Sequence, residues 1–229
     1  MNKNIIHIGI PSKGRLKNDT LNIFKKKKLK IYSERGERDL FGYIKNSNVK
    51  IIYLHARECI EQLSLGNIDV GFSGIDLLKE SEINIQNKIK DIRKYEFGIA
   101  NLVLAIPDLW IDVQTLLDLD EVADEFKKKK KILLRVATKY PNLTREFLYS
   151  KGVTQFQLVK SLGSTEVSPF TGTAEIISDI TSTGATLKAN NLRVLKDGEI
   201  LKSQASMMVS KLSVNKKGIK KLLKLLSNN

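Results

Sequence analysis

The chain has 229 residues, of which 41% are hydrophobic and 28% are charged, so it can bury a sizeable core and is not expected to be disordered. Its single cysteine excludes an internal disulfide, and with only two histidines beside it the sequence argues against a structural zinc site. The apolar run before Pro11 is too short for a signal-peptide core, and no later stretch approaches a membrane span, so we expect a cytoplasmic protein that does not bind membranes.

The formal net charge of +14 favours anionic partners, which could be nucleic acids, membrane surfaces or phosphorylated small molecules. Much of this charge lies in two lysine runs, at 25–28 and 127–131, and such runs are usually solvated helix ends or loops. Modules that bind single-stranded nucleic acids interleave aromatic and basic residues, and these runs contain no aromatic residue. We therefore do not expect nucleic-acid binding to be the main function.

Apolar strand-like segments alternate with helical ones along the chain. In chain order the pattern predicts a strand over 5–11, a helix over 17–29, a strand over 49–55, a helix over 56–66, strands over 68–74 and within 97–107, a helix over 114–130, a strand over 131–140, a helix over 141–152 and an amphipathic helix within 216–229. Such alternation predicts an α/β protein with mainly parallel sheets. Cys59 has the spacing of the buried side of a helix, so we interpret it as a core residue and not as a nucleophile.

Residues 176–192, "IISDITSTGATLKANNL", place an acid before a cluster of hydroxyl side chains around one glycine. The segment 174–180 is predicted as a helix or a strand with Asp179 at its carboxyl end, followed by the loop 181–186 and a helix from Leu187. Hydroxyls, a glycine free to adopt positive φ and a helix N-terminus together suit a phosphate group, and a carboxylate suits the hydroxyls of a ribose. From spacing alone, a capped turn rich in Thr and Ser remains an equal alternative.

Two further turns follow predicted strands, where the ligand sites of open α/β sheets form. The first, "PSKGRL" at 11–16, carries Lys13 and Arg15 around Gly14, which suits a pyrophosphate or triphosphate but lacks the Walker A spacing. The second is "GFSGIDLL", where Ser73 and Gly74 could line a nucleotide or merely cap the next helix. Each turn alone is also typical of an ordinary surface loop.

Four segments in this order resemble the ATP phosphoribosyltransferase family: "GIPSKGRL", "GNIDVGFSGIDLL", "RVATKYPNLTREFLYSKGV" and "GSTEVSPFTGTAEIISDITSTGATLKANNL". They span nearly the whole chain, and "ATKYPNLTR" and "DITSTGATL" are the most diagnostic. The stretches at 53–78 and 101–110, "YLHARECIEQLSLGNIDVGFSGIDLL" and "NLVLAIPDLW", look most similar to a short-form subgroup. We also expect no room after the last helix for the histidine-binding domain of the long form.

The resemblance implies a fold like that of type II periplasmic binding proteins, with two α/β lobes around a cleft. Lobe I would comprise 1–95 and 188–229, and lobe II would comprise 96–187. The implied reaction transfers phosphoribose from phosphoribosyl pyrophosphate to N1 of ATP and releases pyrophosphate, the first committed step of histidine biosynthesis. It needs orientation and charge balance, with no covalent nucleophile and with Mg²⁺ held mainly by the substrate and few protein ligands.

The resemblance also implies the site residues. In the phosphoribosyl pyrophosphate loop, Asp179 would hold the ribose hydroxyls, and the 5-phosphate would lie against Thr181, Ser182, Thr183, Gly184, Ala185 and Thr186. Candidates for the pyrophosphate or the ATP phosphates are Lys13, Gly14, Arg15, Ser73, Gly74, Arg135, Lys139 and Glu166. Glu166 fits equally well as a structural hydrogen-bonding acid.

The resemblance further implies self-association and a regulatory subunit related to histidyl-tRNA synthetase, as in other short-form members. The rival hypothesis is a two-lobed protein that binds a phosphorylated small molecule without catalysis. Such binders are normally exported, and the sequence shows no signal peptide.

Overall fold

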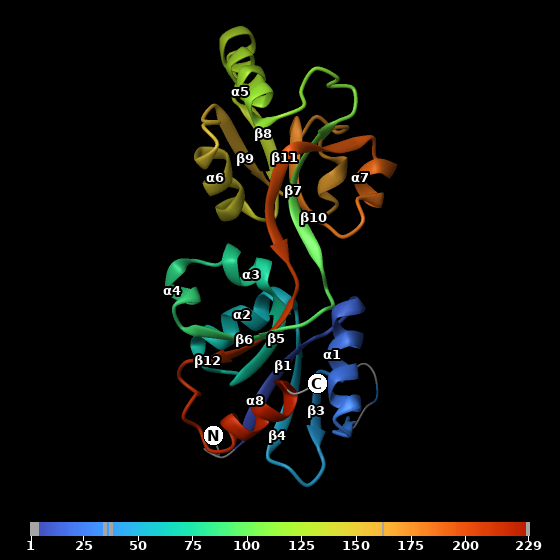
Figure 1. Cartoon of the computed structure of the whole chain (residues 1–229), viewed down its shortest axis with the longest axis vertical. Coiled ribbons are helices and arrows are strands. Elements are labelled where there is room, and N and C mark those ends of the chain that lie inside the picture. Colours follow the sequence, from blue (N-terminus) through green and yellow to red (C-terminus); the bar gives the residue numbers. More distant parts are fainter. Residues whose placement is uncertain (1–4, 34–35, 37–38, 162, 228–229) are drawn as a thin grey trace. The chain divides into compact units, whose positions relative to one another are not determined.

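The computed structural model describes residues 5–33, 36, 39–161 and 163–227 (Figure 1). The chain divides into two compact units. Unit 1 is made of Met1–Gly98 and Gln204–Asn229, and unit 2 is made of Ile99–Ser203. Within the described residues, no helix is both long and apolar enough to cross a membrane.

The boundaries between the units differ from those expected for the two lobes. The chain leaves unit 1 after Gly98 and returns to it at Gln204, whereas we expected the crossings after residues 95 and 187. The return lies later because residues 192–203 form a long strand that pairs within the sheet of unit 2.

Unit 1 is built on a sheet that, in the described part of the chain, has the strand order β2-β3-β4-β1-β5-β12-β6. Its strands are β1 (Ile6–Pro11), β2 (Ile31–Tyr32), β3 (Phe41–Ile44), β4 (Val49–Leu54), β5 (Val70–Gly74), β6 (Ile89–Lys94) and β12 (Ala205–Ser210). β1 pairs in parallel with β4 and β5, and the other neighbours are antiparallel. The carboxyl ends of β1, β4 and β5 therefore lie at one edge of the sheet.

Helices pack on both faces of this sheet. Their bounds are α1 (Gly14–Lys26), α2 (Ala56–Leu65), α3 (Ile75–Glu80), α4 (Ile83–Gln86) and α8 (Ile219–Ser227). On one face Phe24 of α1 and Leu222 of α8 pack with Met207 of β12, and on the other Leu63 of α2 packs with Met208. Neighbouring residues of a strand point to opposite faces, so Met207 and Met208 mark the two layers of the core.

The sheet of unit 2 has the order β11-β7-β10-β8-β9 among the residues described. Its strands are β7 (Ala100–Pro107), β8 (Leu134–Thr138), β9 (Phe156–Lys160), β10 (Ile176–Thr181) and β11 (Leu192–Ser203). β8 is parallel to both β9 and β10, while β7 is antiparallel to β10 and β11. The carboxyl ends of β8 and β10 consequently meet at one edge.

The helical segments of unit 2 also lie on both faces of its sheet. They are α5 (Leu116–Glu125), its π-helical continuation η2 (Phe126–Lys130), α6 (Pro141–Ser150), the 3₁₀ turn η3 (Thr165–Val167) and α7 (Ala185–Ala189). One core cluster joins Leu119 of α5 and Leu148 of α6 to Ile176 of β10, and the other joins Leu187 of α7 to Ile177. α6 and α7 therefore cover opposite faces of β10.

The α/β class and the predicted strands are confirmed, and Gly66 ends α2 with a φ of 73° as its position predicted. The expectation of mainly parallel sheets is wrong, since antiparallel pairings outnumber parallel ones among the described strands. One helix bound was also wrong, since α1 begins at Gly14 and not near Asp19. For the segment 174–180 the sequence allowed a helix or a strand, and the structure has the strand β10 there.

Candidate functional site

The carboxyl edge of β8 and β10 brings together two residues that the sequence analysis named separately. Asp179 lies near the end of β10, and Lys139 directly follows β8. The Asp179 Oδ2 atom lies 3.8 Å from the Lys139 Nζ atom, and Oδ1 accepts a hydrogen bond of 2.8 Å from the Ile180 N–H. These contacts hold the Asp179 carboxylate in place. Its side chain is 15% exposed, so the carboxylate still reaches the surface of unit 2.

The loop after Asp179 is a turn held by its own threonine side chains, and its role as a phosphate cradle stays a prediction. The Thr181 hydroxyl accepts from the Gly184 N–H at 3.0 Å, and the Thr183 hydroxyl accepts from the Ala185 N–H at 3.3 Å. Both hydroxyls act as acceptors in these bonds, so neither bond uses the hydroxyl hydrogen. Ser182, Thr183 and Thr186 are exposed. The loop therefore presents several hydroxyl groups that can donate to an anion.

Gly184 is required in this loop by its backbone angle. Its φ is 73°, in the left-handed region that glycine adopts without strain, and it precedes the first residue of α7. A Cβ atom built on Gly184 would have no neighbour within 4 Å. The glycine thus serves the turn itself, and no other part of the protein crowds it.

Three buried hydroxyl side chains lie behind this edge, and sequence reasoning missed them. They are Thr138 at the end of β8, Thr144 in the first turn of α6 and Ser178 in β10. For Thr138 and Ser178 the available signal was a hydroxyl at a position where the strand pattern called for another apolar residue. Hydroxyl chemistry alone does not distinguish a buried network from a surface loop, so the signal was weak.

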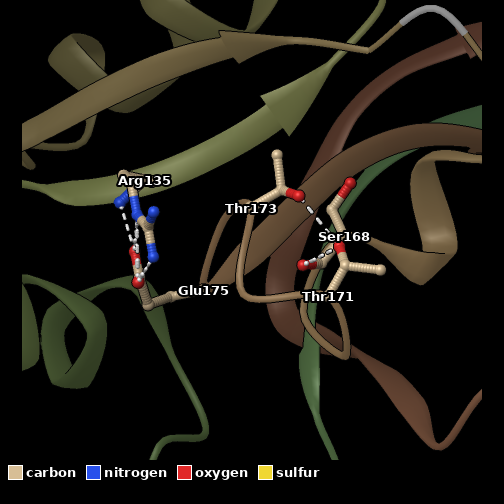
Figure 2. A network of polar contacts seen from close by, with 5 residues as sticks. All are labelled: Arg135, Ser168, Thr171, Thr173 and Glu175. Atoms are coloured by element: carbon tan, nitrogen blue, oxygen red, sulfur yellow. Dashed lines mark hydrogen bonds and ion pairs between the residues drawn. The ribbon is translucent and has the colours of Figure 1, made fainter.

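Arg135 lies at the amino end of β8, away from the carboxyl edge, and forms an ion pair with Glu175 (Figure 2). The distance from Nη2 to Oε1 is 2.5 Å, and the Arg135 backbone N–H donates to Oε2 at 2.7 Å. Burial alone would raise the pKa of Glu175, but the hydrogen bonds and charge of Arg135 outweigh it and lower this pKa. The hydrogen bond to Glu175 raises the pKa of Arg135. Arg135 thus forms a structural pair with Glu175, and its proposed contact with a phosphate stays a prediction.

The turn that precedes Glu175 carries its own polar contacts, also drawn in Figure 2. The Thr171 hydroxyl donates to the Ser168 carbonyl at 3.2 Å and lies 2.8 Å from the Thr173 hydroxyl. These bonds hold the chain as it enters β10, where the Arg135–Glu175 pair is anchored.

Glu166 lies on η3, a turn that contacts β10 in the same unit. Its neighbour Thr165 is buried, and the Thr165 hydroxyl lies 3.0 Å from that of Ser161. The Ser161 N–H in turn donates to the Thr138 carbonyl at 3.0 Å. η3 is therefore tied to the end of β8, and Glu166 remains a candidate ligand of this edge.

In unit 1, Lys13, Gly14 and Arg15 directly follow the carboxyl end of β1. Lys13 precedes α1, Gly14 opens the helix with a φ of 76°, and all three residues are exposed. The first turn of α1 contains no acidic residue. The helix dipole and the two cations therefore favour an anion at this edge.

Ser73 and Gly74, the other candidates in unit 1, have structural partners. Ser73 is fully buried, and its hydroxyl donates to the Ala56 carbonyl at 2.8 Å, which joins the end of β5 to the start of α2. A Cβ atom on Gly74 would collide with the carboxylate of Asp76. The Ser73 hydroxyl thus serves a structural contact and does not cap α3, and the nucleotide contact stays a prediction.

Cys59 is fully buried, and burial raises the pKa of its thiol to about 12. Its prediction as a core residue is confirmed. Across the described parts of the chain, no three His, Cys, Asp or Glu side chains form a group able to hold a metal ion.

Comparison with known sequences gives one consistent result. The model of the ATP phosphoribosyltransferase (HisG) family matches residues 55–228. ATP phosphoribosyltransferases from Nitrobacter winogradskyi and Bradyrhizobium diazoefficiens are 47% and 44% identical over 205 residues, which is 89% of this chain. The chain spans 63% of the length of these relatives.

Solved structures agree with the sequence comparison. An ATP phosphoribosyl transferase (HisG:HisZ) complex from Thermotoga maritima matches with a TM-score of 0.73 and 26% identity, covering 97% of this chain and 96% of that chain. The arginine-bound form of ArgBP from T. maritima matches with a TM-score of 0.54 and 12% identity, covering 98% of this chain and 94% of that one. The latter likeness shows the fold alone, and it agrees with the expected fold of type II periplasmic binding proteins.

Proposed function

The chain belongs to the ATP phosphoribosyltransferase family, and from that premise we propose that it transfers phosphoribose from phosphoribosyl pyrophosphate to N1 of the ATP adenine. The reaction would be the first committed step of histidine biosynthesis, carried out in the cytoplasm. The observation that carries this proposal is the edge of unit 2, where Asp179 and Lys139 meet beside the hydroxyl loop 181–186.

In the proposed reaction the bond from the anomeric carbon to the pyrophosphate oxygen breaks, and a bond from N1 of adenine to that carbon forms. The electron pair leaves with pyrophosphate, and a proton is lost from the adenine amino group. No covalent nucleophile is needed, which agrees with the buried thiol of Cys59. The protein must orient two polyanions and balance their charge.

Each group at the edge of unit 2 has a role in this proposal. The Asp179 carboxylate accepts hydrogen bonds from the ribose hydroxyls, and the hydroxyl groups of the loop 181–186 donate to the 5-phosphate. Lys139 lies beside the carboxylate and keeps this edge from being negative where two polyanions must bind. Lys13 and Arg15 of unit 1 bind the pyrophosphate or the ATP phosphates.

Mg²⁺ enters the proposal bound to the phosphate oxygens of the substrate, which is how this ion commonly binds in phosphate chemistry. When bound, it supplies Lewis acidity to the departing pyrophosphate. Asp179 is the acidic residue of the 179–186 segment, and we assign it to the ribose, so the protein contributes few metal ligands.

We further propose a regulatory partner of the HisZ type, a subunit related to histidyl-tRNA synthetase, together with self-association. Support comes from the likeness to the T. maritima HisG:HisZ complex over nearly the whole of both chains. A reaction rate that rises when a HisZ-type subunit is added would support this partner, and an equal rate without it would count against it.

The ultraviolet absorbance change on N1 substitution of adenine measures the reaction, with ATP, phosphoribosyl pyrophosphate, Mg²⁺ and pyrophosphatase present, and with and without a HisZ-type subunit. We expect a signal that needs both substrates. Asp179→Asn should lower kcat/KM for phosphoribosyl pyrophosphate by about tenfold or more, since it removes a charged acceptor from the ribose. Asp124→Asn on α5, whose side chain is 47% exposed, is the matched control and should leave it unchanged. Folded protein that gives no signal in either setting would refute the proposed activity.

A further inference from the structure

On the sheet face that α6 covers, the buried side chains change from apolar to hydroxyl-bearing at the carboxyl ends of β8 and β10. Leu134 and Val136 of β8 and Ile176 of β10 are fully buried apolar residues of one core cluster. Side chains alternate along a strand, so the next positions on this face are Thr138 and Ser178. Both are also buried, with 1% and 0% exposure. On this face of β8 and β10, hydroxyls thus replace apolar side chains only at the strand ends next to the candidate site.

These hydroxyls form a directed chain of hydrogen bonds. The Tyr140 N–H donates to the Thr138 hydroxyl at 2.9 Å, and the Thr144 hydroxyl donates to Ser178 at 2.8 Å. The Thr138 and Thr144 hydroxyl oxygens are 3.3 Å apart. A hydroxyl has one hydrogen, and Thr144 gives its hydrogen to Ser178, so Thr138 must be the donor to Thr144. This chain of hydroxyl groups runs from the end of β8 through the first turn of α6 to β10.

The hydroxyl chain and the ion pair join the same two strand ends. Thr138 and Ser178 are partners in the parallel register of β8 and β10. The residues that follow them, Lys139 and Asp179, form the 3.8 Å ion pair. Asp179 points to the opposite face from Ser178, because adjacent strand residues alternate. A shift of Ser178 would therefore carry the Asp179 backbone with it.

We propose that Thr138, Thr144 and Ser178 are positioning residues. They fix the positions of Asp179 and the loop 181–186 relative to α6 and Lys139. This inference rests on the proposed function for what the loop binds. Apolar contacts are not directional, whereas hydrogen bonds fix their partners in distance and angle. A site that orients a phosphoribosyl group needs that definition, because a displacement of about 1 Å can cost about a hundredfold in rate.

The variant Thr144→Val tests the role of these three hydroxyls, since valine keeps the shape of the threonine side chain and removes its hydroxyl. We expect kcat/KM for phosphoribosyl pyrophosphate to fall by about tenfold to a hundredfold, with a smaller change in the KM for ATP. We also expect faster hydrogen exchange of the amides in 180–186. Thr144→Ser keeps the hydroxyl and should restore both measurements.

Thr20→Val is the matched control. Thr20 of α1 is as fully buried as Thr144, and its hydroxyl donates to the Leu16 carbonyl at 2.7 Å within unit 1. Its loss should lower the stability of the protein and leave kcat/KM and the exchange of 180–186 unchanged.

The possible outcomes separate this inference from the proposed function. A Thr144→Val protein that loses stability as Thr20→Val does, with normal kinetics and normal exchange of 180–186, overturns the positioning role. An inactive wild-type protein refutes the proposed function instead. In that case the exchange of 180–186 in Thr144→Val, and its reversal in Thr144→Ser, still decides whether the hydroxyl chain holds the loop.

Discussion

The buried carboxylate of Asp69 fastens the C-terminal segment of unit 1 to β1. It is 3% exposed and accepts from the Ser213 hydroxyl at 2.6 Å, the Lys216 ammonium at 2.7 Å and the His7 backbone N–H at 2.8 Å. Ser213 and Lys216 belong to the segment between β12 and α8, so one side chain joins the start of β1 to the end of the chain.

Asp69→Asn should lower the free energy of unfolding of unit 1 by about 3 kcal/mol. Hydrogen bonds to a charged acceptor contribute about 1.5 to 3 kcal/mol each, and breaking a buried ion pair costs about 3 to 5 kcal/mol. Asparagine keeps one neutral oxygen and turns an N–H₂ group toward the remaining donors. The Lys216 side chain is 24% exposed, so water recovers part of the loss and the lower end of the range applies.

Urea unfolding followed by far-ultraviolet circular dichroism measures this change. With a urea m-value of about 1.5 kcal/mol/M, a loss of 3 kcal/mol lowers the midpoint by about 2 M. Asp124→Asn is the control, because its ion pair with Lys128 is exposed and is worth less than about 1 kcal/mol. Equal midpoints for the two variants would refute the argument that Asp69 anchors the C-terminal segment.

Two further predictions concern unit 2. Gly184→Val should cost about 1 to 2 kcal/mol of stability, because valine is strained at a φ of 73°, and should lower activity at least about tenfold by moving the loop backbone. Gly152 is an equally open position with a φ of 85°, so Gly152→Val should lower the stability by the same amount and leave the activity unchanged. Similar activity in the two variants would contradict the loop assignment. The pKa of Glu175 is lowered from 4.5, so its pairing with Arg135 stabilises the fold above that pH and is lost as the pH falls through the lower folded value. Urea midpoints of Glu175→Gln should thus depend less on acidification than those of the wild type, and parallel profiles would count against the pair.

Local structure was largely predictable because it depends on neighbours in the sequence. Gly66 ends α2, Pro141 opens α6, and Cys59 is buried, each as its spacing indicated. The hydroxyl loop was found for the same reason, since Gly184 and its flanking threonines form a turn through bonds between residues two or three positions apart. The boundary at residue 187 was wrong because the length of β11 is set by pairing with β7, a strand far away in the sequence.

The roles of charged residues at the site were less predictable. Arg135 and Lys139 look alike as candidate phosphate ligands, yet Arg135 pairs with Glu175 and Lys139 reaches Asp179. Four positions separate the two cations along the chain, and the strand carries them to opposite ends of β8. Which acid each meets depends on the register of β8 and β10, and no local pattern encodes that register.

The sequence by itself determined the alternation of strands and helices, the hydroxyl loop and the family resemblance, because periodicity, turn chemistry and motif order are properties of contiguous residues. Only the tertiary structure decided that Ser73 ties β5 to α2 and that Thr138, Thr144 and Ser178 form one buried chain. A hydroxyl side chain looks the same in a sequence whether it faces a ligand or a buried partner. Its role is settled by which segments the sheet brings within about 3 Å of it, since a hydrogen bond acts only over that distance.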